Sequence, residues 1–60
     1  MLKLYDKIRL VTGETAWIVE VLESGVAYMV DVDKEKGGWE TITVSFSDIK
    51  SVFRERGLKI

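Results

Sequence analysis

The sequence predicts an all-β fold, and two features carry most of that prediction. Residues 15–33 read as two strands joined at Glu23-Ser24-Gly25, because β-branched and aromatic residues dominate both arms and Gly25 can adopt the positive φ of a tight hairpin. Farther along, Ser47-Asp48-Ile49-Lys50 contains helix-capping residues but is too short for an α-helix. This segment suits one turn of 3₁₀ helix.

The first expected strand covers residues 4–11 and has one solvated face. Leu4, Ile8 and Leu10 share its apolar side, while Tyr5 lies on the opposite, polar side.

The two strands of the hairpin also show side chains that alternate between two faces. In the second expected strand, over residues 15–22, Trp17 shares a side with two apolar residues, Val19 and Val21. The core side of the third expected strand carries Tyr28, Val30 and Val32.

This alternation leaves several apolar residues outside the core phase. Ile18 and Leu22 on the second strand, and Met29 on the third, are expected to point outward. The fourth expected strand, over residues 39–46, places Trp39 outward with two threonines. Its inward positions are Ile42, Val44 and Phe46. A last strand is expected over residues 51–54.

Five short strands with one 3₁₀ turn before the fifth follow the order of an SH3-like barrel, in which strand closure removes exposed sheet edges. An OB-like barrel is the second choice, because that fold usually has longer strands and a true helix. The barrel is expected over residues 1–56, with a C-terminal tail over residues 57–60.

Four runs of the chain resemble a known family of small bacterial domains of unknown function, DUF4926. The runs are YDKIRL (5–10), AWIVEV (16–21), GVAYMVDV (25–32) and VSFSDIKSV (44–52). They are similar to the family order D-x-V-x-L, G-T-I-V-E-V, G-x-Y-x-V-x-F and V-x-L-x-x-x-D-L. The chain departs from it at Thr15-Ala16-Trp17, which replaces a small V-G-T, and in a shorter connection after the first strand. The resemblance implies an SH3-type barrel, related in shape to KOW and Tudor modules, and supplies no catalytic residues.

Composition limits the chemistry that is open to the chain. Its 60 residues are enough for one domain, and with neither Cys nor His it lacks disulfides, thiolate ligands and the usual general base. No enzyme activity, metal or cofactor is expected. The N-terminal residues lack the apolar run of a signal peptide, and no stretch is long enough to cross a bilayer, so a cytoplasmic protein without membrane contact is expected.

Two apparent motifs have simpler explanations. Asp31 and Asp33 fall on one face of a strand, about 7 Å apart, and such a carboxylate pair could bind a cation or act as acid and base. A solvated strand face is the favoured interpretation. Gly37-Gly38 precedes no Gly-Lys-Ser/Thr sequence and no helix, so it is interpreted as a turn and not as a phosphate loop.

The two tryptophans are the better functional clue. An exposed indole at Trp39 is unusual, and SH3-like modules hold peptides or stacked bases on aromatic surfaces. Packing over the ends of the barrel is the alternative explanation, especially for Trp17. The leading hypothesis is a non-enzymatic protein-interaction or assembly module. Its expected interaction surface consists of Ile18, Leu22, Met29, Trp39 and Trp17.

Charge is unevenly distributed although the net charge is only −1. No Lys or Arg occurs between Val11 and Asp33, whereas six basic residues fall near the two ends of the chain: Lys3, Lys7, Arg9, Lys50, Arg54 and Arg56. The second hypothesis is therefore a nucleic-acid-binding barrel that uses the edge formed by its first and last strands. Its candidate residues are Lys7, Arg9, Lys50, Arg54 and Arg56. Opposite charges on one small molecule also favour self-association, and a homodimer is the expected form.

Overall fold

The computed structural model describes residues 2–53, and in that range the expected all-β fold is confirmed. The chain forms five strands and one short 3₁₀ helix. They are β1 (Lys7–Leu10), β2 (Thr15–Glu23), β3 (Ala27–Asp33), β4 (Trp39–Ser45), η1 (Phe46–Asp48) and β5 (Ile49–Phe53). Arg54, Arg56 and the expected tail over residues 57–60 lie outside the described residues.

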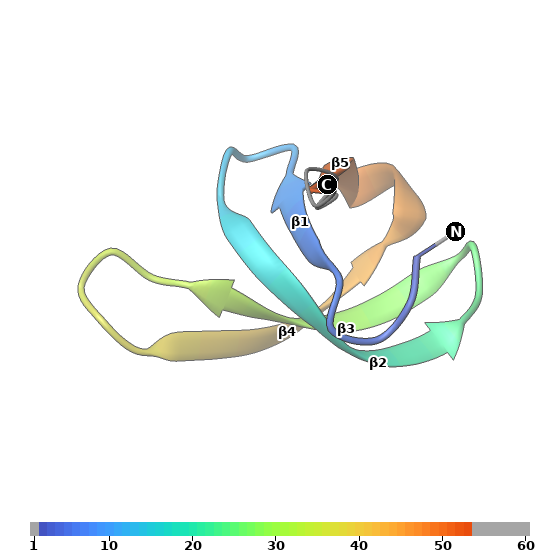
Figure 1. The fold of residues 1–60 in the computed structure, drawn as a ribbon, viewed down its shortest axis with the longest axis horizontal. Coiled ribbons are helices and arrows are strands. Elements are labelled where there is room, and N and C mark those ends of the chain that lie inside the picture. The colour runs from blue at the N-terminus through green and yellow to red at the C-terminus, as the bar shows by residue number, and fades with distance from the viewer. Residues whose placement is uncertain (1, 54–60) are drawn as a thin grey trace, which may run out of the picture.

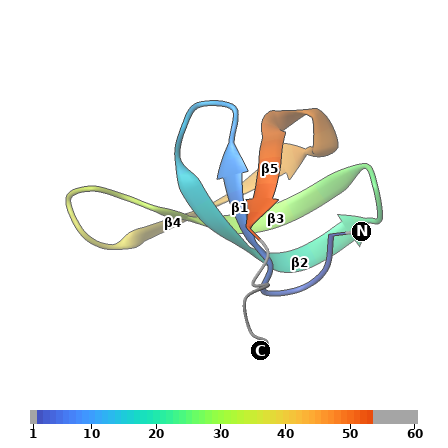
Figure 2. The same cartoon turned by 45° about the horizontal axis from the view of Figure 1, so that its top comes forward.

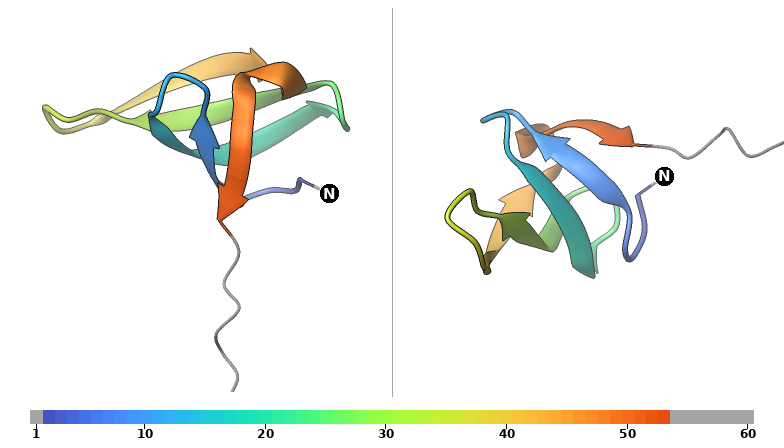
Figure 3. Two further views of the ribbon diagram at one scale, coloured as in Figure 1. Left: turned by 90° about the horizontal axis from the view of Figure 1, so that it is seen from above. Right: turned by 60° about the vertical axis from the view of Figure 1, so that its left-hand side comes forward.

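All five strands belong to one antiparallel sheet with the order β4-β3-β2-β1-β5. The last strand therefore returns to pair with the first, as the sequence predicts. The sheet is strongly curled, so that β1 and β5 turn over one side of the layer formed by β2, β3 and β4 (Figures 1 and 2). From above, β5 crosses β3 and β4 steeply (Figure 3). Within residues 2–53, the edge strands β4 and β5 are not neighbours in the sheet, so it is open.

The core fills the concave side of this curl, here called the inner face. It contains nine buried apolar residues: Leu2, Ile8, Leu10, Ala16, Ile18, Tyr28, Val30, Val32 and Val44. The expected core phase of β3 is thus confirmed. Tyr28 is buried together with its hydroxyl group. That hydroxyl accepts a hydrogen bond from the Gly25 N–H at 2.6 Å, so its polar end is not left without a partner. Gly25 has a φ of 80°, which lets the β2–β3 turn present that N–H to the ring.

An irregularity in β2 overturns the expectation that Ile18 points outward. Ile18 pairs with Val30, but the next pair is Glu20 with Met29, so Val19 is an extra residue without a partner. Trp17 and Glu20 consequently share the outer face, whereas Ile18 is fully buried on the inner face. The prediction for Ile18 is wrong because strict alternation assumes an unbroken ladder, and a β-bulge reverses the phase beyond it.

Phe46 and Leu4 also differ from expectation. Phe46 is 53% exposed, because the chain leaves the strand after Ser45 and enters η1. The Asp48 carboxylate stabilises this exit by accepting hydrogen bonds from the Ser45 N–H at 3.0 Å and from the Ser45 hydroxyl at 3.2 Å. Leu4 is exposed because it lies in a turn that precedes β1 and not in the strand itself.

Candidate functional site

The outer face of the sheet carries a continuous row of side chains that crosses all five strands. Register places Lys7 opposite both Phe53 and Trp17, Trp17 opposite Asp31, and Asp31 opposite Thr41. We call these residues the cross-sheet row; in sheet order they are Phe53, Lys7, Trp17, Asp31 and Thr41. Directly opposed residues are the closest side-chain neighbours in an antiparallel sheet, so the row joins strands that are far apart in sequence.

The two tryptophans meet on this face. Trp39 pairs with Asp33, and so it lies on the same face of β4 as Thr41, two residues before it. Its indole is 60% exposed and meets the half-buried Trp17 ring edge to face, with centroids 5.2 Å apart and planes at 77°. The outward position expected for Trp39 is confirmed. Trp17 packs against another surface ring, and not over an end of the core.

Tyr5 lies beside the two tryptophans in the structure. The sequence did not single it out as a candidate site residue, and placed it only on the polar side of the first expected strand. It is 75% exposed and has a φ of 70°, which is uncommon for a residue with a side chain. Its N–H donates to the Ile18 carbonyl at 2.7 Å, and the turn around it is closed by the Asp6 carboxylate, which accepts from the Lys3 N–H at 3.1 Å. These contacts hold Tyr5 against β2.

Tyr5, Trp17, Asp31 and Trp39 together line a shallow cavity of about 330 Å³ that is open to solvent. Asp31 is half-buried there and accepts a hydrogen bond from the Thr41 hydroxyl. Among residues 2–53 it has no ion-pair partner. The site therefore combines three aromatic rings with one carboxylate that forms no ion pair with any described residue.

The opposite half of the outer face is basic. The Lys7 ammonium lies 5.5 Å from the centroid of Trp17 and 5.0 Å from that of Phe53, and the Arg9 guanidinium lies 5.3 Å from the Phe53 centroid. Lys50 is exposed on β5 at the point where the pairing with β1 shifts by one residue. The structure thus brings Lys7 and Arg9 together over one ring at the β1–β5 edge, whereas Arg54 and Arg56 fall outside its described range.

Leu22 and Met29 do not join the tryptophans. Leu22 is 48% exposed but lies near the turn into β3, and Met29 is half-buried between Glu20 and Thr43. Trp39 pairs with Asp33 at the other end of β3, and the rise of a strand puts that end about 20 Å from the turn beside Leu22. The five residues of the expected interaction surface therefore form no single patch, since Ile18 is in the core and Leu22 is remote.

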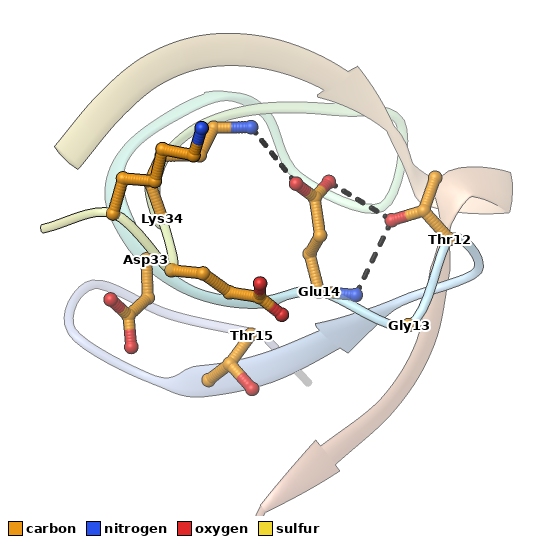
Figure 4. Close-up of a pocket in the computed structure, with 8 residues that line it drawn as sticks. Thr12, Gly13, Glu14, Thr15, Asp33 and Lys34 are labelled. Atoms are coloured by element: carbon orange, nitrogen blue, oxygen red, sulfur yellow. Dashed lines mark hydrogen bonds and ion pairs between the residues drawn. The ribbon is translucent and has the colours of Figure 1, made fainter.

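A second, polar cavity of about 780 Å³ lies between the β1–β2 and β3–β4 loops (Figure 4). Lys34 reaches the carboxylates of Glu14 at 2.9 Å and Glu40 at 3.2 Å. The hydrogen bond from Lys34, aided by one from Thr12, holds the pKa of Glu14 below its ordinary value, and the same carboxylates raise the pKa of Lys34. Within residues 2–53 no cluster of His, Cys, Asp or Glu could hold a metal. The ion pair of Lys34 with Glu14 therefore joins the two loops that border this cavity.

Comparison with models of protein families, with curated proteins and with solved structures found no match. The resemblance to DUF4926 stays a prediction. In the part of the chain that the structure describes, no helix is long or apolar enough to cross a bilayer. The fold and site define the chain as a small all-β protein, built on one curled antiparallel sheet with an aromatic and charged outer face.

Proposed function

We propose that this chain is a small, non-enzymatic protein-interaction module of the SH3-like class, and that its outer face binds the partner. The strand order, the pairing of β5 with β1 and the position of η1 support the SH3-like assignment. A cytoplasmic location, expected because the sequence has neither a signal-peptide run nor a stretch that could cross a bilayer, belongs to the same proposal.

The observation that carries the proposal is the placement of the aromatic residues. The chain has six of them, two each of Trp, Tyr and Phe. Only Tyr28 is in the core, and four line the outer face: Tyr5, Trp17, Trp39 and Phe53. Rings exposed to solvent contribute little to the stability of a 60-residue fold, whereas Trp and Tyr are the residues that most often anchor a protein interface.

Selection of binders from a random peptide library tests this function even though the partner is unidentified. We expect the selected peptides to shift the indole N–H resonances of Trp17 and Trp39 in an NMR titration. Trp39→Ala should weaken their binding by about tenfold or more, as expected for an interface anchor. Phe46→Ala is the matched control, because Phe46 is an exposed ring on η1. Binders that map to η1, or equal affinity for both variants, would contradict the proposal.

A second candidate function is single-stranded nucleic-acid binding, and the contact of Lys7 and Arg9 with the Phe53 ring favours it. Cationic side chains beside exposed rings can hold phosphates while bases stack. The net charge of −1 argues against it, because long-range attraction to phosphates is weak. A gel-shift titration against salt decides between the two candidates. Binding that persists near physiological salt and falls with Arg9→Ala would favour nucleic acid, and the absence of a shift would leave the protein partner.

A further inference from the structure

The cavity on the outer face has the composition of a cation site. The faces of aromatic rings carry negative potential, and a cation within about 6 Å of a ring centroid is attracted to it. Three of the four residues that line the cavity are aromatic, and the fourth is Asp31. One Asp31 oxygen accepts the Thr41 hydroxyl, and none of the salt bridges within residues 2–53 neutralises the carboxylate. A half-buried charge in this state is incompletely compensated.

We propose that Tyr5, Trp17, Trp39 and Asp31 form a pocket for one organic cation, the ammonium or guanidinium head of a basic side chain on the protein partner. This inference rests on the proposed function and specifies the chemistry of its ligand. The cavity is shallow and open to solvent, so it can receive the exposed head group of one side chain while the rest of the partner stays outside it.

Other ligand classes fit the pocket poorly. An anion would be repelled by Asp31, and a purely apolar side chain would desolvate that carboxylate without pairing it. A divalent metal would need several oxygen ligands, whereas the cavity offers one carboxylate. The rings of this face already attract one cation within the chain. The Lys7 ammonium lies over Trp17 and Phe53, although Lys7 does not line the cavity.

The backbone of Tyr5 gives independent support. Tyr5 has a positive φ, which is unfavourable at a residue other than Gly, and such strain clusters at functional sites. The side chain gains little burial in return, because it is 75% exposed. The conformation does place a third ring at the cavity that already contains Trp17, Trp39 and Asp31.

The test uses a cation and its neutral isostere on the intact chain. Choline and n-butylguanidinium are titrated into labelled protein, in parallel with 3,3-dimethylbutan-1-ol, and the Trp17 and Trp39 indole resonances report binding. We expect the cations to bind about tenfold more tightly than the neutral alcohol. Asp31→Asn keeps an oxygen that can accept from Thr41 and should reduce that preference severalfold, leaving only the attraction of the rings. Asp33→Asn is the matched control, because Asp33 is on the same strand and face but outside the cavity.

The library peptides connect this test to the proposed function and keep the two failures distinct. Replacing the anchoring Lys or Arg of a bound peptide with norleucine should weaken its binding by about tenfold with the native chain and by clearly less with Asp31→Asn. Peptides that bind the face without a basic anchor would overturn the pocket and leave the proposed function standing. Equal affinity for choline and the neutral alcohol would also overturn the pocket. If the chain binds choline but no peptide, the ligand is not a side chain of a protein partner, and the proposed function is wrong as well.

Discussion

At the scale of single residues, the backbone of Tyr5 is unfavourable for stability, and the proposed cation pocket would account for it. Its positive φ is unfavourable for a residue with a side chain, and glycine adopts that conformation freely. We expect Tyr5→Gly to leave the free energy of unfolding unchanged or to raise it by about 1 kcal/mol, while cation binding is lost. Tyr5→Ala is the control, because it removes the ring and keeps the strain. Urea unfolding in which the Gly variant is less stable than the Ala variant would show that the backbone is not strained.

Glu14 gives a prediction about pH. Because its pKa in the folded state is lowered, chiefly by the Lys34 hydrogen bond, its contribution to stability is present above the ordinary Glu pKa of about 4.3. That contribution is lost as the pH falls through the lowered value. Glu14→Gln should therefore be less stable than the native chain at pH 7, and the difference should disappear in strong acid. Glu35→Gln is the control, since Glu35 lines the same cavity but makes no ion pair within residues 2–53. Chemical denaturation across pH measures both, and a pH-independent gap would refute the linkage.

At the scale of elements, the bulge in β2 decides which side chains reach the core. Ile18 is fully buried, whereas its neighbour Val19 is the unpaired residue and is exposed. Ile18→Ala should lower the free energy of unfolding by about 2–5 kcal/mol, because it leaves a cavity, and Val19→Ala by about 1 kcal/mol or less. Thermal and urea unfolding of the two variants provide the measurement. Similar losses would mean that the ladder continues through Val19 without a bulge.

The third strand gives a companion test of phase. Val30→Asp places an unpaired charge in a fully buried position, and a core of this size cannot absorb it, so the variant should be unfolded by far-UV circular dichroism. Met29→Lys should be tolerated, because Met29 lies on the outer face opposite Glu20, where a Lys would face an opposite charge. A native-like spectrum for Val30→Asp would show that the assigned phase of β3 is wrong.

At the scale of the whole molecule, the distribution of charge on the outer face is self-complementary. In the cross-sheet row, Lys7 lies on one side of Trp17 and Asp31 on the other. A two-fold arrangement can place each Lys7 against the Asp31 of a second copy. We expect the mass measured by light scattering to rise with concentration at low salt and to return to that of a monomer at about 0.5 M salt, where exposed charges are screened. Lys7→Glu should abolish the association, and a monomer at high micromolar concentration in low salt would exclude it.

The sequence by itself determined the strands, their order along the chain, the β2–β3 turn and the core phase of Tyr28, Val30 and Val32, because each depends on residues adjacent in the chain. It also placed Trp39 in the outward phase of its strand, whereas the exposure of the indole became known only from the structure. Only the tertiary structure decided the burial of Ile18, since a bulge depends on pairing with β3 and local alternation cannot reveal it. The cavity of Tyr5, Trp17, Asp31 and Trp39 likewise depends on the register of β2, β3 and β4 and on a turn held by a contact with Ile18. Those contacts join residues distant in sequence, and for that reason the candidate site became visible only once the sheet was assembled.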